Sequence, residues 1–395
     1  MTQSSRLWTK DFIIISLINF FTHVVFYMLI VIAAIYVVEE FNASQSMAGL
    51  AAGIFVLASL FARIFAGKNL DRIGRKRMLI GSLVLFVVAM ILHLFANTLL
   101  LFLAIRFIHG FTHGCVTTAA GAISAELIPD ERRGEGTGYY STFMNVSMAI
   151  GPFLAMFLYA NFSFNAIFIV GIIVAVVDLL ITFFLKVPER KTVETGKKGF
   201  HIKDYIEPKA LPISLMLLIL SIPYSSLLSF LGQYAIEIDL VNVSSYFFVV
   251  FAVALIATRP FTGVWFDRFG ANRVNLPLLL LLAVGFFMLC TAERGLMFLL
   301  SAAFIGIGFG TLLSNFLAMA VQSSPPHRKA LATSTFFMFL DFSNGIGPFI
   351  NGMLVTYLTF GDLYFGVAIC ITACIGIYYV MFRKKEKNQA VSEAM

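Results

Sequence analysis

Three ionisable side chains share one face of an apolar segment at residues 98–122. Arg106, His109 and His113 are followed by Thr117, at spacings of three or four residues. On a helix, such spacings place all four side chains on one stripe. A charge at the centre of a membrane span costs about 2.5–3.5 kcal/mol unless it faces water or a partner. We therefore expect this stripe to face a polar cavity, where Arg106 contacts a solute and His109 and His113 contact the solute or exchange protons.

Two further groups of polar residues are expected to line the same cavity. Asn19, His23 and Tyr27 recur at every fourth residue of an apolar run, so one helical face carries all three. Tyr224 follows Pro223, where we expect a helix break that lines the cavity.

Two acids interrupt apolar segments and are candidates for binding a proton. Acids inside a membrane are functional candidates by default. We favour Asp341 for proton exchange over a role in bonding a neighbouring helix. For Asp178 the two roles remain equally open. His93, near the end of its apolar run, is expected at the membrane interface.

The composition indicates a membrane protein. The chain has 395 residues, of which 59% are hydrophobic and only 12% are charged, whereas soluble domains carry about 25% charged residues. Its four cysteines lie inside apolar runs without metal-ligand spacing, so no disulfide framework is expected. No nucleotide-binding loop, hydrolytic triad or metal constellation is present, so we expect no enzyme activity, catalytic residue, cofactor or metal. The first apolar run is too long for a signal peptide, so its helix is expected to be retained.

Apolar runs long enough to cross a bilayer recur along the whole chain. Twelve spans are predicted, at residues 12–38, 46–66, 78–97, 98–122, 138–160, 164–187, 211–234, 245–265, 275–292, 296–320, 331–356 and 363–382. The predicted fold is all-α, with six-helix halves at 1–187 and 210–383, a cytoplasmic middle loop at 188–209 and a cytoplasmic tail at 384–395. Within the middle loop, residues 200–206 are open to two interpretations, a short surface helix or a soluble linker.

The two halves are copies of one unit. The basic segment 63–77, which we expect to form a loop between two spans, returns at 259–270, displaced by 196 residues. The same displacement relates further pairs: Gly110 and Gly306, Gly114 and Gly310, Pro129 and Pro325, Arg132 and Arg328, and Gly151-Pro152 and Gly347-Pro348. A constant displacement indicates an internal repeat, and two like halves in a membrane chain suggest a transporter.

The polar stripe is not repeated. The second copy has Ala302, Ile305 and Phe309 where the first has Arg106, His109 and His113. Because the fold is repeated and the stripe is not, we interpret the stripe as functional.

The basic residues predict the orientation. All but four of the 28 Lys and Arg residues lie in segments that face one side, if both termini are cytoplasmic. The formal charge of +7 is therefore explained by topology, and we expect no nucleic-acid partner.

Three motifs resemble those of a known family. The residues Gly67, Asp71, Arg72, Gly74 and Arg75 resemble the loop 2–3 signature of the major facilitator superfamily. Arg106, His109 and Gly110 resemble its second signature, which usually has Gln at the position of His109. Gly151-Pro152 resembles the antiporter signature of bacterial drug–proton exporters, although Ala155-Met156 replaces the usual Gly-Gly.

The resemblance implies a gate built from the repeated basic segment. Its predicted members in the two halves are Arg63, Gly67, Asp71, Arg72, Gly74, Arg75 and Glu126, and Arg259, Gly263, Asp267, Arg268 and Gly270. Gly67 and Gly74 would permit close backbone approach and a tight turn. Asp71 would bond a helix N-terminus or an arginine, and Glu126 would pair with the loop arginines. A solvated basic turn is the alternative.

The Gly-Pro pairs are expected to bend two spans. Gly151-Pro152 and Gly347-Pro348 lie in the fifth and eleventh spans, where proline removes a helix hydrogen bond. Close packing between the two halves is the alternative interpretation.

Together, these features predict a transporter. The resemblance implies a monomeric, proton-coupled exporter of a small organic solute, a drug or a metabolite, in the lipid bilayer of a bacterial cell membrane, working by alternating access. A dedicated exporter of an anionic or zwitterionic metabolite, such as an opine or carboxylate metallophore, is the alternative. A membrane sensor that transports nothing is a further alternative of another class.

Overall fold

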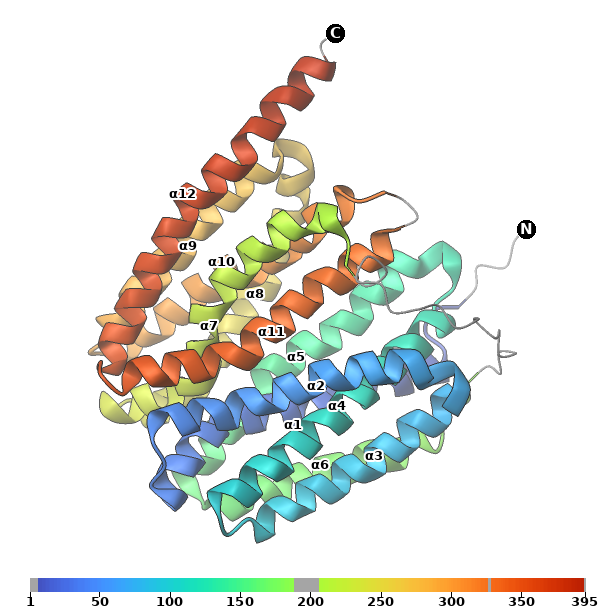
Figure 1. Ribbon diagram of the computed structural model, residues 1–395, viewed down its shortest axis with the longest axis vertical. Helices are drawn as coiled ribbons and strands as arrows, with labels where there is room; N and C mark the ends of the chain where they lie inside the picture. The colour runs from blue at the N-terminus through green and yellow to red at the C-terminus, as the bar shows by residue number, and fades with distance from the viewer. Residues whose placement is uncertain (1–5, 188–205, 326–327, 394–395) are drawn as a thin grey trace. The chain divides into compact units, whose positions relative to one another are not determined.

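The computed structural model describes residues 6–187, 206–325 and 328–393, and long helices dominate them (Figure 1). The first six are α1 (Lys10–Phe41), α2 (Gln45–Ile73), α3 (Arg75–Leu92), α4 (Leu99–Leu127), α5 (Arg133–Asn161) and α6 (Phe164–Thr182). The next six are α7 (Leu211–Glu237), α8 (Val241–Phe269), α9 (Ala271–Cys290), α10 (Gly295–Gln322), α11 (Lys329–Val355) and α12 (Phe360–Glu393). Short 3₁₀ turns are η1 (His93–Phe95), η2 (Asp130–Arg132) and η4 (Pro208–Ala210).

The chain divides into two compact units, Met1–Lys198 and Gly199–Met395. In Figure 1 the first unit runs from blue to green and the second from green to red. Residues 200–206, predicted as a short helix or a linker, lie outside the described residues except for Ile206, which precedes η4.

The repeated basic segment is almost entirely helical, so its prediction as a loop was wrong. Only Gly74 separates α2 from α3, and only Gly270 separates α8 from α9. Their φ angles of 92° and 82° lie in the left-handed region, which glycine enters without the steric penalty that a Cβ imposes. A single glycine therefore turns the chain between two long helices in each unit.

Matching helices pack together in the two units. In the first, α2 packs on α4 and α1 on α5; in the second, α8 packs on α10 and α7 on α11. A Cβ added at Gly110 would lie 2.1 Å from the Phe55 carbonyl oxygen, and one at Gly306 would lie 2.4 Å from that of Phe251. Because no real Cβ sits so close to a carbonyl oxygen, only glycine allows these helix pairs to approach.

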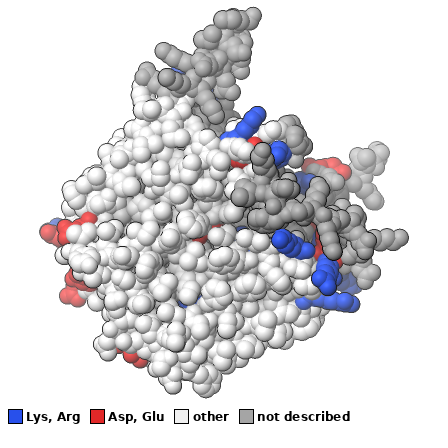
Figure 2. All heavy atoms as spheres, viewed as in Figure 1, with Lys and Arg blue, Asp and Glu red and all other residues white. Residues whose placement is uncertain are grey.

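Eleven of the described helices are long and apolar enough to cross a membrane, namely all of the twelve except α11. Although α11 has 27 residues, Asp341, Ser343, Asn344 and Asn351 interrupt its apolar run. Figure 2 shows Lys and Arg side chains mainly on the right of the view, and Asp and Glu side chains on both its left and its right. Which side of the membrane the Lys and Arg residues face stays a prediction.

Candidate functional site

Arg106 is buried between α2 and α4 of the first unit. Its side chain is 1% exposed, and its guanidinium carbon lies 4.7 Å from the centre of the Phe55 ring. Its Nε donates to the Ala51 carbonyl oxygen at 3.0 Å and its Nη2 to that of Ala52 at 3.5 Å. Its Nη1 has no hydrogen-bond partner among the described residues. Arg106 is therefore packed against the α2 backbone within its own unit.

Four histidines form a row through the first unit. Ring centres are 5.4 Å apart between His93 and His109, and 5.3 Å apart between His113 and His23. His109 and His113 are one turn apart on α4, where Cβ atoms are about 5–6 Å apart. We call His93, His109, His113 and His23 the histidine row.

Phenylalanines surround the histidine row. Phe86 lies 4.3 Å from His109 between ring centres, and Phe55 lies 5.3 Å from His109 and 5.1 Å from His113. Phe26 stacks on His113 at 5.1 Å. The four imidazoles thus lie in a line among apolar rings, and the residues involved come from α1, α2, α3 and α4 and the turn after α3.

The two ends of the row have defined tautomers. The Nδ1 of His93 lies 2.8 Å from the Ala89 carbonyl oxygen, and the Nδ1 of His23 lies 2.7 Å from that of Asn19. Because a carbonyl oxygen can only accept, each Nδ1 carries the hydrogen. His113 Nδ1 meets the Ser59 hydroxyl at 3.3 Å. Neither ring nitrogen of His109 has a hydrogen-bond partner among the described residues.

Two of these histidines lie deeper in the unit than residue spacing indicates. His93 is 1% exposed and packs against His109, and its position at the membrane interface stays a prediction. The ring of His23 packs against His113. The other members of its stripe are nearby: Asn19 donates to the Tyr140 carbonyl oxygen at 3.2 Å, and the Tyr27 ring centre lies 6.3 Å from that of His23.

Asp178 is completely buried in the first unit. Its Oδ2 accepts from the Thr22 hydroxyl at 2.6 Å, while its Oδ1 has no hydrogen-bond partner among the described residues. Thr22 lies on α1 and Asp178 on α6, so the bond joins two spans. Burying an ionised carboxylate without a cationic partner carries a large desolvation cost.

Asp341 is placed differently. It lies on α11 in the second unit and is partly exposed there. The two candidate acids thus belong to different units and differ in burial. Which of them binds a proton stays a prediction.

Helix α7 is continuous through Pro223, so the predicted break there was wrong. Asn351 on α11 donates to the Ile222 carbonyl oxygen at 2.9 Å and supports the chain next to this proline. Tyr224 is buried and stacks on Phe309, with ring centres 3.4 Å apart. Tyr224 therefore packs against the residue that replaces His113 in the second unit.

The Gly-Pro pairs lie inside continuous helices, with Pro152 in α5 and Pro348 in α11. A Cβ at Gly151 would lie 2.8 Å from the Val24 carbonyl oxygen on α1. One at Gly347 would lie 2.8 Å from that of Ile222 on α7. Both glycines therefore allow close packing within a unit. That the pairs bend their helices stays a prediction.

In the first unit, Arg75 joins the end of α2 to the end of α4. It makes an ion pair with Glu126, and its Nη2 lies 3.4 Å from Asp71 Oδ1. Asp71 itself is 68% exposed. Next to Arg75, Lys76 Nζ donates to the Leu185 carbonyl oxygen at 2.6 Å, after the end of α6. The pairing of Glu126 with a loop arginine is present, and its role in gating stays a prediction.

The second unit keeps the turn but lacks the ion pair that Arg75 and Glu126 make in the first. Ala271 and Gln322 occupy the positions of Arg75 and Glu126. Asn272, at the position of Lys76, donates to the Phe382 carbonyl oxygen at 3.3 Å. Arg259 Nη2 contacts the Ser314 hydroxyl at 3.3 Å, whereas the side chain of Asp267 lies outside the described residues.

The remaining gate candidates are less constrained. Arg72 and Arg268 are exposed, and Arg63 is partly exposed. A Cβ added at Gly67 or at Gly263 would meet no atom of the described residues within 4 Å. That Gly67 permits a close backbone approach in a gate stays a prediction.

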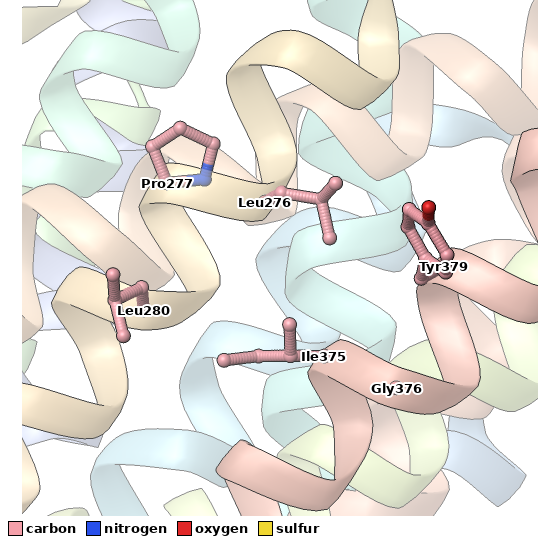
Figure 3. Close-up of a pocket in the computed structure, with 6 residues that line it drawn as sticks. All are labelled: Leu276, Pro277, Leu280, Ile375, Gly376 and Tyr379. Atoms are coloured by element: carbon pink, nitrogen blue, oxygen red, sulfur yellow. The ribbon is translucent and has the colours of Figure 1, made fainter.

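A metal centre and a surface groove are two other kinds of candidate site. Within the part of the chain that the structure describes, no group of three or more His, Cys, Asp or Glu side chains could hold a metal ion. One apolar groove lies between α9 and α12 (Figure 3), and it contains none of the candidate residues. Its lining residues are Leu276, Pro277, Leu280, Ile375, Gly376 and Tyr379.

Sequence reasoning missed His93, Ser59 and Thr22 as members of the polar interior. Ser59 contacts His113, Thr22 contacts Asp178 and His93 contacts His109, each from a different helix or turn. Residue spacing within one helix could not indicate these contacts. A search for every polar residue within an apolar run would have found them, without showing which ones meet.

The helices, their repeated packing and the buried polar groups define a multi-pass membrane protein built from two like units. Comparison with known proteins then identifies the family. Residues 15–249 and 213–394 each match the Major Facilitator Superfamily, and the chain belongs to it. It is therefore a transporter and not an enzyme, and lies in a membrane with many passes.

Individual relatives are more distant. The chain is 23% identical over 403 residues to the multidrug resistance protein MdtG of Dickeya zeae, covering 98% of each. It is 30% identical over 199 residues to a Na+, Li+, K+/H+ antiporter of Planococcus maritimus, covering 49% of this chain and 46% of that one. The crystal structure of a mutant of the nucleoside transporter NupG superposes with a TM-score of 0.81 at 11% identity, covering 94% of this chain and 100% of NupG. At this identity the likeness shows the fold alone.

Proposed function

We propose that this protein is a proton-coupled exporter of a small organic solute, which crosses the cell membrane twelve times with both termini in the cytoplasm. It works as a single chain in the lipid bilayer and alternates access by rocking its two halves. In this proposal α11 also crosses the membrane, as the eleventh of the twelve spans, and Asp341 on it binds the coupled proton.

One observation carries the coupling part of the proposal: titratable groups are buried in the membrane-spanning helices of the first unit. The histidine row and Asp178 lie there at 8% exposure or less. Burying such groups is costly, and intramembrane ionisable residues commonly mark proton or solute paths. The second unit has Leu289, Ile305, Phe309 and Cys374 at the positions of His93, His109, His113 and Asp178, so the fold does not require them.

The relatives support export and ion exchange without fixing the substrate. MdtG is named for multidrug resistance, and the Planococcus protein for exchange of monovalent cations with protons. Moving one charge down 100 mV releases about 2.3 kcal/mol, which sustains roughly a 50-fold solute gradient. A membrane potential of this size is therefore sufficient to drive export if one net charge moves per cycle.

An anionic or zwitterionic solute is a second candidate, and its support is the cationic Arg106. The structure limits this support, because Nε and Nη2 are already bound to the carbonyl oxygens of Ala51 and Ala52. Nη1 has no hydrogen-bond partner among the described residues, and the side chain as a whole is 1% exposed.

Flux through proteoliposomes tests the proposal. The purified protein is reconstituted with a pH-sensitive dye trapped inside, and ethidium and benzoate are added in turn as cationic and anionic probes. Proton movement that depends on an added solute is the expected result, and metabolite levels inside and outside cells, with and without the gene, then extend the search. If no probe and no metabolite moves protons, the protein is not a coupled exporter and the sensor alternative gains support.

A further inference from the structure

The groove between α9 and α12 lies on an exposed face of the second unit. Both helices are long and apolar enough to cross a membrane. Leu280 is 57% exposed and Tyr379 is 42% exposed, and the other residues that line the groove are apolar (Figure 3). Because the hydrocarbon core of a bilayer contains no water, lipid acyl chains must cover such a face.

Two hydrogen bonds join α9 to α12 beside the groove. Asn275 on α9 donates to the Tyr378 hydroxyl on α12 at 2.9 Å, and Asn272 donates to the Phe382 carbonyl oxygen at 3.3 Å. On the open side, a Cβ added at Gly376 would meet no atom of the described residues within 4 Å. The bonds therefore fix the spacing of the two helices, and the missing side chain at Gly376 leaves room between them.

A cation lies at one end of the groove. Arg273 precedes Leu276 and Leu280 by three and seven residues, which places it on the same face of α9. Its side chain is exposed. Further along α12, beyond the groove, the sequence has Arg383. Arginine binds phosphate groups through two parallel hydrogen bonds, so an apolar groove that ends at an arginine matches the chemistry of a phospholipid.

The first unit has the same cation but differs at the glycine. Arg77 occupies the position of Arg273. Leu180 occupies the position of Gly376, and its side chain is 54% exposed. A leucine side chain therefore stands in the first unit where the second unit leaves space.

We propose that the groove between α9 and α12 binds an anionic phospholipid, with one acyl chain between the two helices and the phosphate group at Arg273. This inference requires only that the chain lies in a membrane, so it goes beyond the proposed proton-coupled export and does not depend on it. In the orientation predicted from the Lys and Arg residues, the start of α9 faces the cytoplasm. Anionic lipids give the cytoplasmic leaflet a negative surface potential, and basic pockets between helices on that side bind their head groups.

Photocrosslinking in lipid nanodiscs tests the site. The discs consist of phosphatidylcholine with a small fraction of a probe lipid, which is phosphatidylglycerol or phosphatidylcholine with a diazirine on one acyl chain. After irradiation, mass spectrometry measures the labelling of the α9 and α12 peptides that line the groove, relative to the α3 and α6 peptides at the matching positions of the first unit. The phosphatidylglycerol probe should label the groove about fivefold more than the phosphatidylcholine probe.

Two variants separate the space from the charge. Gly376→Leu introduces the residue that the first unit carries at this position, and it should lower labelling of the groove by phosphatidylglycerol by about fivefold or more, because the added side chain displaces the acyl chain. Arg273→Gln should reduce labelling by phosphatidylglycerol to the level of phosphatidylcholine, because the phosphate loses its cation. Both positions are exposed, so both variants should fold, and thermal unfolding verifies this.

Each variant has a matched control. Gly366→Leu adds the same side chain at another exposed position of α12, where a Cβ also meets no atom of the described residues within 4 Å. Arg77→Gln removes the matching arginine of the first unit. Both controls should leave labelling of the groove at the wild-type level.

Three outcomes overturn the proposal. The first is equal labelling of the groove by the two probe lipids in the wild type, which describes ordinary surrounding lipid. The second is unchanged labelling in Gly376→Leu, and the third is an equal loss in Gly366→Leu. None of these outcomes bears on export, which the proteoliposome flux tests separately.

Discussion

The two units share the contacts that bring helices together and differ in what lies between them. Gly110 and Gly306 allow the same helix pairs to approach, and Gly74 and Gly270 make the same one-residue turn. Between these shared points, the first unit buries Arg106 and the histidine row, and the second has Phe309 stacked on Tyr224. The comparison teaches that the repeat preserves the close backbone approach, whereas the buried arginine and histidines of the first unit are additional to it.

The largest expected effect concerns an arginine that both units have. Arg328 pairs with Glu207, which is 3% exposed, and Glu207 N–H also donates to the Thr335 hydroxyl at 2.9 Å. Arg132, at the same position in the first unit, pairs with exposed Glu135 at 2.7 Å. Arg328→Ala should lower the free energy of unfolding by about 3–5 kcal/mol, because it leaves a buried carboxylate unpaired.

Arg132→Ala is the matched control, and it should change the free energy of unfolding far less because its ion pair is solvated. Unfolding in detergent, followed by circular dichroism, measures both. Similar costs in the two variants would show that burial of Glu207 does not distinguish the units.

The second prediction concerns proton coupling by the second unit. Asp341→Asn should reduce proton-driven solute flux by about 100-fold or more, since the amide cannot take up the proton. Exchange of solute for solute needs no net proton movement and should persist. Flux in proteoliposomes with and without a pH gradient measures the difference. Unchanged coupled flux would remove Asp341 from the mechanism and leave the acid and histidines of the first unit.

The third prediction tests the shared contacts. Gly110→Ala and Gly306→Ala should each destabilise the protein by about 1–3 kcal/mol, because the added methyl group would overlap a backbone carbonyl and force the helices apart. Thermal unfolding of the purified variants gives the shift. If only one of them destabilises, the close approach is not an equivalent feature of the two units.

The smallest effect is expected at the open glycines. A Cβ at Gly67 or Gly263 meets no atom within 4 Å in the part of the chain that the structure describes, and alanine favours a helix over glycine by up to about 1 kcal/mol. Gly67→Ala and Gly263→Ala should therefore leave the unfolding temperature unchanged or slightly raised. A marked loss of transport in these stable variants would instead indicate that a neighbour approaches this face during the cycle.

The order of apolar residues predicted the long helices. The constant displacement of 196 residues predicted which positions of the two units correspond. They did not predict which side chains meet. His93 was assigned to the interface from its position near the end of a run, yet the chain continues into η1 and packs His93 against His109. Such contacts depend on how each helix is rotated about its axis relative to its neighbour. Residue spacing within one helix gives no information about that rotation.

The prediction of a loop at residues 63–77 failed for a related reason. Charged residues were read as a connection between spans, but Lys68 and Arg72 continue α2 and Arg75 begins α3. Helices can extend beyond the apolar core, and a single glycine is enough to reverse the chain when its φ is positive.

The one-residue turn at Gly74 has a mechanical consequence. A long flexible connection would let α2 tilt while α3 stayed in place, because the slack would absorb the movement. Here the connection is short and hydrogen-bonded on both sides. Gly74 N–H donates to the Leu70 carbonyl oxygen, and Met78 N–H donates to the Gly74 carbonyl oxygen. The one-residue turn should therefore pass a tilt of α2 on to α3. Inserting residues at this turn should uncouple the two helices while leaving every charged residue in place.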